Sequence, residues 1–191
     1  MSVNLRMNKS IPDGLSVREM EAGDIESIIR YWLSADASYL AGMGVDIDKM
    51  PSREQWTEML ARQIALPLRD KESYCIIWLA DGRPSGHSNI RPIVFGQEAS
   101  MHLHVWEGSL RKEGRGLQWL RMTLPWYFEK FQLKKIVCEP YALNPAPNRT
   151  LVKAGFQLVK EYRTTPGFLN FEQPVRRWEM NAEDLFNSPK G

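Results

Sequence analysis

The sequence has no long apolar run, little net charge and only two cysteines. No uninterrupted apolar stretch approaches the ~20 residues that span a bilayer, and no leader-like segment follows Met1, so we expect a cytoplasmic protein that does not contact a membrane. The 25 basic and 23 acidic residues are too evenly balanced for the basic surface typical of nucleic-acid binding. Cys75 and Cys138 lie in separate apolar segments, which favours buried reduced thiols over a disulfide framework or a metal motif.

The length of 191 residues fits one domain with its own core. Residues 14–181 carry periodic apolar patterns without a repeat or a linker, and we expect them to form that single domain. Residues 1–13 are polar and aperiodic, and residues 182–191 resemble a second frayed end, so both are expected to be tails.

Hydrophobic periodicity predicts a mixed sheet with about four helices. Alternating or continuous apolar runs indicate strands over 15–20, 74–80, 85–95, 99–106 and 133–140, followed by an antiparallel edge pair within 156–163 and 169–180. Apolar residues at helical spacing indicate helices over 25–33, 51–66, 117–131 and 147–155. Asp24 is the expected N-cap of the first helix, Ser52 and Gln55 have capping-box spacing, and Pro174 is expected on an edge strand or at a bulge.

The segment 34–51 joins the first two helices and exposes apolar residues without a clear period. It contains Gly42, Gly44 and Pro51. Two interpretations remain open: a packed helix-to-helix connection, or a lid over a substrate.

Gly114 and Gly116 stand where the long amphipathic helix begins. A glycine costs a helix roughly 1 kcal/mol relative to alanine, so a pair in the first turn indicates a backbone that needs clearance. After a strand, such a turn points unpaired N–H groups beyond the strand end, where they favour an anion. Arg111, Lys112 and Arg115 add positive charge, so the loop predicts a diphosphate ligand.

A Rossmann dinucleotide site needs three glycines after a first strand near the start of the chain and an acidic residue about 20 positions on, and this pattern is not found. Arg111, Gly114 and Gly116 instead form Arg-x-x-Gly-x-Gly, and NPAPNRTLVKAGF follows at 144–156. Together these motifs resemble the GNAT N-acetyltransferases, in particular the branch with the ribosomal-protein N-terminal acetyltransferases. Over roughly residues 15–180 the resemblance implies an α/β (α+β) fold: a mostly antiparallel sheet of about seven strands, a parallel fourth and fifth strand, and about four helices.

The resemblance also implies acetyl-CoA as cofactor. Its pyrophosphate would lie on the amides of residues 111–116, Lys112 and Glu113 included, and its pantetheine arm would enter a cleft where the fourth and fifth strands separate. Backbone groups of Val105 and Trp106 would border the arm and polarise the thioester. Asn144 and Asn148, from the second motif, would contact the cofactor.

Acyl transfer to an amine requires a neutral amine, an electrophilic carbonyl and a proton for the departing thiolate. Glu139 matches the position of a general base in some family members; the alternative is a structural carboxylate satisfied by its neighbours. His104 or His102 could serve instead, although a histidine pair on one strand face is also typical of simple packing. The tyrosine that many relatives use as acid is replaced by Leu151, so Tyr141 is the candidate acid. The family serine is replaced by Pro147.

Substrate contacts are expected from the third and fourth strands. His87 borders the acceptor groove in this family, and His102 lies beside it; an ordinary half-buried histidine is the alternative. No third ligand stands near these histidines, so zinc is not expected. Trp32, Trp56 and Trp119 have helical spacing typical of core, whereas Trp106 stands near the expected cleft.

Three functions follow from these residues. The first is an N-acetyltransferase that moves an acetyl group directly to a primary amine of a small molecule or a protein N-terminus. The second is an acyl-CoA-binding sensor or partner module without efficient catalysis, which the replaced tyrosine and serine favour. The third, a histidine-based metal hydrolase, predicts bound zinc. The acceptor, an acyl group larger than acetyl, and the choice between monomer and homodimer stay open at this stage.

Overall fold

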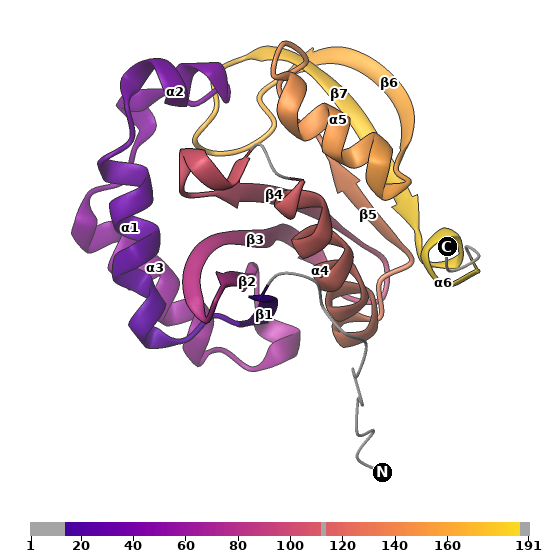
Figure 1. Cartoon of the computed structure of the whole chain (residues 1–191), viewed down its shortest axis with the longest axis horizontal. Coiled ribbons are helices and arrows are strands. Elements are labelled where there is room, and N and C mark those ends of the chain that lie inside the picture. Colours follow the sequence, from indigo (N-terminus) through magenta and orange to yellow (C-terminus); the bar gives the residue numbers. More distant parts are fainter. Residues whose placement is uncertain (1–13, 112–113, 188–191) are drawn as a thin grey trace.

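Seven strands form one sheet in the order β1-β2-β3-β4-β5-β7-β6 (Figure 1). The structure is a computed structural model and describes residues 14–111 and 114–187; the expected N-terminal tail, Lys112 and Glu113 lie outside these residues. The strands are β1 Leu15–Glu19, β2 Tyr74–Ala80, β3 Arg83–Val94, β4 Glu98–Val105, β5 Lys135–Cys138, β6 Gln157–Thr164 and β7 Gln173–Asn181. Every neighbouring pair is antiparallel except β4 and β5. The predicted sheet is confirmed.

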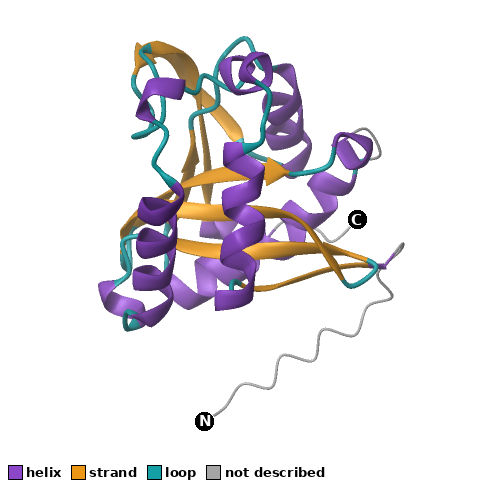
Figure 2. Cartoon of the chain, turned by 90° about the vertical axis from the view of Figure 1, so that its left-hand side faces the viewer, coloured by secondary structure: helices purple, strands orange, loops and turns teal. Residues whose placement is uncertain are grey.

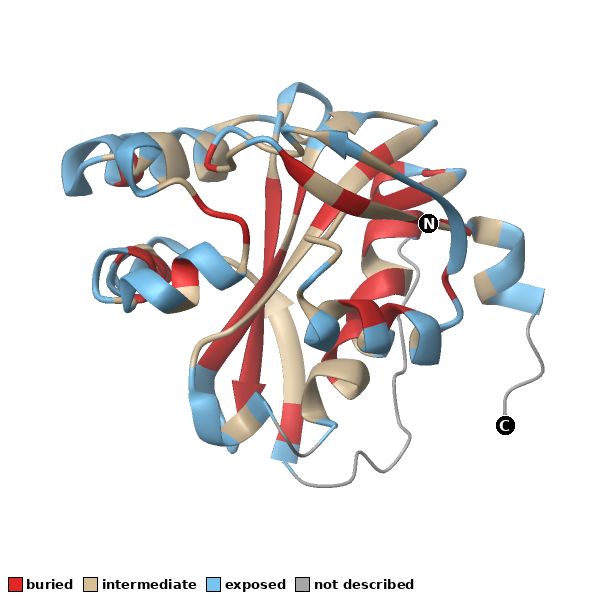
Figure 3. Cartoon of the chain, turned by 90° about the horizontal axis from the view of Figure 1, so that it is seen from above, coloured by how far each residue is buried: buried red, intermediate tan, exposed pale blue. Residues whose placement is uncertain are grey.

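Helices cover both faces of the sheet because the strands alternate apolar side chains between them. In β2, Ile76 and Trp78 pack in the cluster that contains α4 Arg115–Phe131 and α5 Pro145–Ala154. Cys75 and Ile77, on the other face, pack with α1 Ile25–Leu33 and α3 Arg53–Ala65. Figure 2 shows the α1 and α3 side in front of the strands, and Figure 3 shows buried residues concentrated on the strands and the inward helix faces.

Most of the expected signals at the helix ends are present in the structure. Ser52 Oγ accepts the Gln55 N–H, and Gln55 Oε1 accepts the Ser52 N–H at 2.8 Å, so the capping box that starts α3 is confirmed. Gly155 ends α5 with a φ of 98°. Asp24 occupies the N-cap position of α1 as expected, but its carboxylate makes no cap hydrogen bond, because it accepts hydrogen bonds from Arg18 at 2.6 and 2.8 Å and from the Glu21 N–H at 2.8 Å.

The segment 34–51 is a packed connection. It contains α2 Ala37–Gly42 and is tied to the segment before β7, because the Gly44 carbonyl accepts hydrogen bonds from Asn170 at 2.9 Å and Gln173 at 3.1 Å. A Cβ on Gly44 would lie 1.8 Å from Gln173 Oε1, so this contact needs glycine.

Two expectations near the C-terminus need correction. Residues 182–187 form α6 Ala182–Asn187 rather than a tail, because Leu185 packs on the core and the Phe186 ring lies 6.3 Å from that of Phe128. Pro174 is not on an edge strand, since β7 lies between β5 and β6. The proline is tolerated there because the short β5 pairs only with residues 178–181 of β7.

Within the described ranges 14–111 and 114–187, no helix has both the length and the apolar composition that crossing a membrane requires.

Candidate functional site

The two parallel strands separate halfway along β4. They pair only at Glu98–Lys135, Ala99–Ile136 and Ser100–Val137, and β4 then continues to Val105 while β5 ends at Cys138. This edge of β4 therefore loses its hydrogen-bonding partner after Ser100, which confirms the expected opening between the fourth and fifth strands.

Backbone groups of β4 face this opening in alternation. The Trp106 N–H donates to the Ser85 carbonyl on the β3 side at 2.9 Å. Because N–H groups alternate along an antiparallel edge, those of Leu103 and Val105 point to the side that β5 has left. Val105 is therefore placed as expected, whereas the Trp106 N–H is already used inside the sheet and is not available to a ligand.

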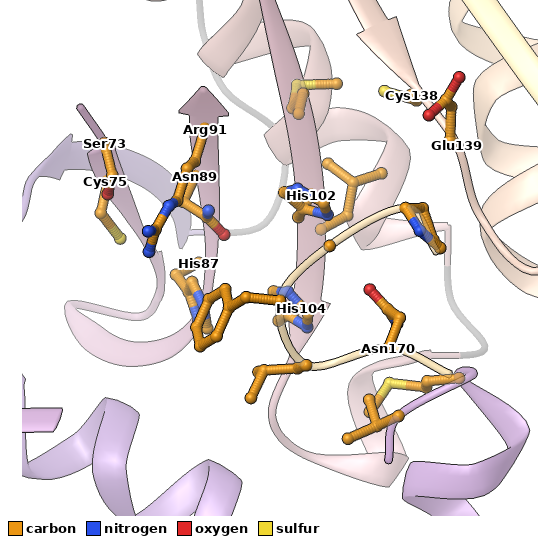
Figure 4. Close-up of a pocket in the computed structure, with 18 of the residues that line it drawn as sticks. Ser73, Cys75, His87, Asn89, Arg91, His102, His104, Cys138, Glu139 and Asn170 are labelled. Atoms are coloured by element: carbon orange, nitrogen blue, oxygen red, sulfur yellow. The ribbon is translucent and has the colours of Figure 1, made fainter. Parts of the chain in front are cut away.

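A cavity of about 470 Å³ continues from this opening across the sheet. Its floor is formed by β3, β4 and the end of β5, and its roof by α1, α3 and the segment 166–170. We call the part under α1 and α3 the acceptor pocket; it is lined by His87, Asn89, Arg91, His102 and His104 from the strands and by Trp32, Trp56, Met59, Leu60 and Phe168 from the roof (Figure 4).

The two glycines at the start of α4 have different environments. Gly114 has a φ of 72°, which disfavours other residues, and a Cβ built on it would meet no atom of a described residue within 4 Å. Among the described residues, a Cβ on Gly116 would meet only Val105 Cγ2 within that distance, at an ordinary 3.7 Å. None of the residues that the structure describes therefore blocks the first turn of α4. It also meets the requirement for an anion, because the first N–H groups of a helix lack intrahelical partners.

Arg111 binds the end of β4. Its Nε and Nη2 donate to the carbonyls of Val105 and Trp106, each at 3.1 Å, and its guanidinium lies 4.2 Å from the centre of the Tyr39 ring. Positive charge therefore lies between the opening and the first turn of α4. Lys112 and Glu113 of the same motif fall outside the described residues, and Arg115 is the first residue of α4.

The second motif forms the wall of the opening. Asn144 caps α5, accepting the Ala146 N–H at 3.3 Å, and it lines the cavity together with Pro147 and Leu151. Asn148 is only 4% exposed: its amide donates to the carbonyls of Tyr141 and Asn144 and accepts from Trp178 Nε1 at 2.8 Å. We correct the prediction that Asn148 contacts the cofactor, because its hydrogen bonds hold the protein's own turn.

Glu139 lies at the end of β5 and lines the cavity. Its Oε1 accepts hydrogen bonds from the Tyr162 hydroxyl and, at 2.9 Å, from Arg177 Nη1. Its Oε2 has no hydrogen bond to a residue that the structure describes. Glu139 is therefore anchored by one oxygen and has the second available. Tyr141, two residues later, also lines the cavity, and its ring lies edge-on to that of Phe171 at 6.1 Å.

The three histidines share one face of β3 and β4. His87 pairs with His104 in the register, and their rings stack at 4.6 Å. Burial lowers the pKa of His87 to about 3, and it lowers the pKa of His104 well below the usual value and that of His102 in the same direction. His87 Nδ1 accepts from Trp106 Nε1 at 2.8 Å, and His104 Nδ1 lies 3.3 Å from the Tyr31 hydroxyl. The lowered pKa values keep the group neutral at pH 7.

Several site residues were missed or misassigned from the sequence. Trp32 and Trp56 are buried as predicted, stacked at 5.9 Å, but they also line the acceptor pocket. Asn89 and Arg91 share the strand face of His87, and their spacing of two residues was a usable signal. Phe168 comes from a segment without periodicity, so no pattern indicated it.

The comparisons with known proteins agree on one fold. Residues 47–164 match the family model described as an acetyltransferase (GNAT) domain. The spermidine N-acetyltransferase of Vibrio cholerae in complex with CoA and spermine is 16% identical, with a TM-score of 0.74 over 91% of this chain and 99% of that one. A ribosomal L7/L12 alpha-N-protein acetyltransferase bound to coenzyme A is 16% identical, with a TM-score of 0.72 over 88% and 94%.

An aminoglycoside acetyltransferase in complex with coenzyme A is 15% identical, with a TM-score of 0.69 over 91% of this chain and 98% of that one. At these identities the solved structures establish the fold, and the family resemblance of the sequence motifs is confirmed. The ribosomal-protein enzyme is one of several similar structures. No curated protein matches the chain.

Proposed function

Because the chain belongs to the GNAT acetyltransferase family, we propose that it transfers an acetyl group from acetyl-CoA directly to a primary amine of a small molecule or a protein N-terminus. The observation that carries the proposal is the half-open edge of β4, which leads from the first turn of α4 into the acceptor pocket. Acetyl-CoA supplies an activated thioester there, and a bound amine would reach it from the acceptor pocket.

Donor binding is assigned to the open turn and the β4 edge. The amides of residues 114–116 would hold the pyrophosphate, with charge from Arg111, Lys112 and Arg115 beside them and Glu113 in the same loop. Asn144, which lines the cavity, would contact the pantetheine arm. The N–H groups of Leu103 and Val105 face the opening and would polarise the thioester carbonyl.

Glu139 is the proposed general base. Its Oε1 is paired with Arg177, and Oε2 remains to take a proton from the incoming ammonium, directly or through water. Tyr141 is the proposed acid for the departing thiolate. His104 is the alternative base. His87 and His102 are proposed to contact the substrate.

One observation favours the second candidate, an acyl-CoA-binding module without efficient catalysis. Leu151, at the position of the usual family tyrosine, is 1% exposed and lines the cavity, so no hydroxyl can act from there. Catalysis in this chain would then depend on Tyr141 or on water.

The test is a thiol-release assay with acetyl-CoA and a panel of primary amines. Glu139→Gln is expected to lower kcat by about 10² or more, because a general base contributes about 10²–10⁴ to rate, while the affinity for CoA stays unchanged. Glu161→Gln is the matched control. Glu161 is an exposed residue of β6, and its carboxylate lies 2.8 Å from Arg176 Nε. Tight CoA binding without turnover of any amine would instead establish the binding module.

A further inference from the structure

The charged side chains that line the cavity include a cation without an acidic partner among the described residues. Its four charged side chains are Arg62, Glu72, Arg91 and Glu139. Both carboxylates lie near cations: Glu139 lies 2.9 Å from Arg177 Nη1, a guanidinium that it shares with Glu179, and Glu72 lies 3.8 Å from Arg62 Nη2. Among the residues that the structure describes, Arg91 has no carboxylate partner. Glu139 is therefore the carboxylate that can meet an amine, and Arg91 is a cation of the cavity without such a partner.

The Arg91 guanidinium is oriented by an aromatic side chain rather than by a charge. It lies 4.8 Å from the centre of the Phe168 ring, and that ring packs edge-on against Trp56 at 6.1 Å. A cation–π contact holds the guanidinium without neutralising it, so its N–H groups keep their capacity to bind a carboxylate in a bidentate manner. Asn89 precedes Arg91 on the same face and offers an amide beside it (Figure 4).

The remaining floor of the acceptor pocket is uncharged. His87 and His104 are held neutral by burial, and Trp32 and Trp56 form an apolar roof. Asn89 pairs with His102, and Arg91 lies two residues farther along β3, a distance of about 6.6 Å. Figure 4 shows His102 between Arg91 on one side and Glu139 on the other. β4, which carries His102, lies between the strand of Arg91 and the strand that Glu139 follows, so an amine near Glu139 and an anion at Arg91 would belong to one small molecule that spans β4.

We propose that Arg91 binds a carboxylate of the acceptor, so that the substrate is a small amine that also carries a carboxylate. This inference rests on the proposed function, because it names the substrate class of the same pocket. It separates the chain from acetyltransferases of polyamines, whose acceptors carry only positive charge.

The test uses matched pairs of amines that differ only in the carboxylate. They are 6-aminohexanoate with 6-aminohexanamide, and phenylalanine with phenylalaninamide; spermidine serves as the polycation. In at least one pair, kcat/KM is expected to be about 10- to 100-fold higher for the acid than for the amide, the range that a charge-assisted hydrogen-bonded pair supports. Spermidine is expected to be the poorest acceptor.

Variants of Arg91 test whether this arginine causes the preference for amines that carry a carboxylate. Arg91→Gln is expected to remove the preference for the acid mainly through KM, and Arg91→Lys to restore part of it. Arg83→Gln is the matched control, because Arg83 is an exposed arginine of the same strand outside the cavity. Thermal unfolding of each variant verifies that it is folded.

Equal or better activity with the amides or spermidine would overturn the inference, as would an acid preference that survives in Arg91→Gln. A preference for peptides over every free amine would overturn its small-molecule form. If no amine is acetylated, the proposed function fails separately, and calorimetry of the same pairs with the CoA-loaded protein decides the inference: binding without an acid preference, or no binding, overturns it.

Discussion

His87 illustrates how one residue type takes its properties from its surroundings. It is 3% exposed, and its Nδ1 accepts the indole N–H of Trp106, a bond that only an unprotonated nitrogen can accept. Burial lowers its pKa to about 3. At neutral pH this histidine is therefore a hydrogen-bond acceptor in the pocket floor, and an active-site role for it would be contact rather than proton transfer.

The depressed pKa of His87 predicts acid sensitivity of the fold. An unfolded histidine binds a proton below about pH 6.5, whereas folded His87 remains neutral down to about pH 3. Its contribution to the free energy of unfolding is thus fully present above pH 6.5. Between these values the contribution falls by about 1.4 kcal/mol per pH unit as the pH is lowered.

The measurement is urea unfolding of the wild type and His87→Asn between pH 7 and 5. Asparagine offers an oxygen for Trp106 but does not titrate, so below pH 6.5 the free energy of unfolding of the wild type should fall relative to that of His87→Asn by about 1.4 kcal/mol per pH unit. A difference that is constant over this range would show that His87 has the same pKa in the folded and the unfolded state.

At the scale of elements, the two glycines at the start of α4 have different roles. Gly114 adopts a left-handed conformation, so Gly114→Ala is expected to lower the free energy of unfolding by about 1–2 kcal/mol. Gly116 lies within the helix and has open space around it, so Gly116→Ala is expected to raise stability by about 0.5–1 kcal/mol. Urea unfolding of both variants measures these changes, and equal effects of the two substitutions would refute the distinction.

At the scale of the whole molecule, the proposed donor site would link α4 to strands on both sides of the opening. A ligand at 100 times its Kd stabilises the folded state by about 2.7 kcal/mol, which for a chain of this length raises Tm by about 5–10 °C. Acetyl-CoA and CoA are expected to produce this shift.

Pantetheine lacks the pyrophosphate and is the control for the role of the α4 amides. It is expected to shift Tm by much less than CoA at the same concentration, because it forgoes the anion contacts at residues 114–116. Equal shifts for pantetheine and CoA would place the binding energy in the β4 opening instead, and the assignment of the glycine turn would then be wrong.

The sequence by itself determined the seven strands and the four longer helices in their order, whereas α2 and α6 were not predicted. Strand alternation, the capping box at Ser52, and the glycine that ends α5 are local signals, because each depends on residues within one or two turns. The Arg-x-x-Gly-x-Gly motif and the segment 144–156 together indicated the family, since each is one continuous stretch of sequence. The parallel pair β4 and β5, which precedes and follows the glycine loop, was predicted from the strand-helix-strand order.

Only the tertiary structure decided which side chains share the acceptor pocket and which already form hydrogen bonds elsewhere in the protein. Arg91, Phe168 and Trp56 come from three distant segments, and their contacts exist only once α3 and the segment before β7 lie over the sheet. Asn148 looked like a ligand contact but is satisfied inside the protein. The physical reason is the same in both cases: burial, charge pairing and hydrogen-bond satisfaction depend on neighbours in space, which sequence spacing does not record.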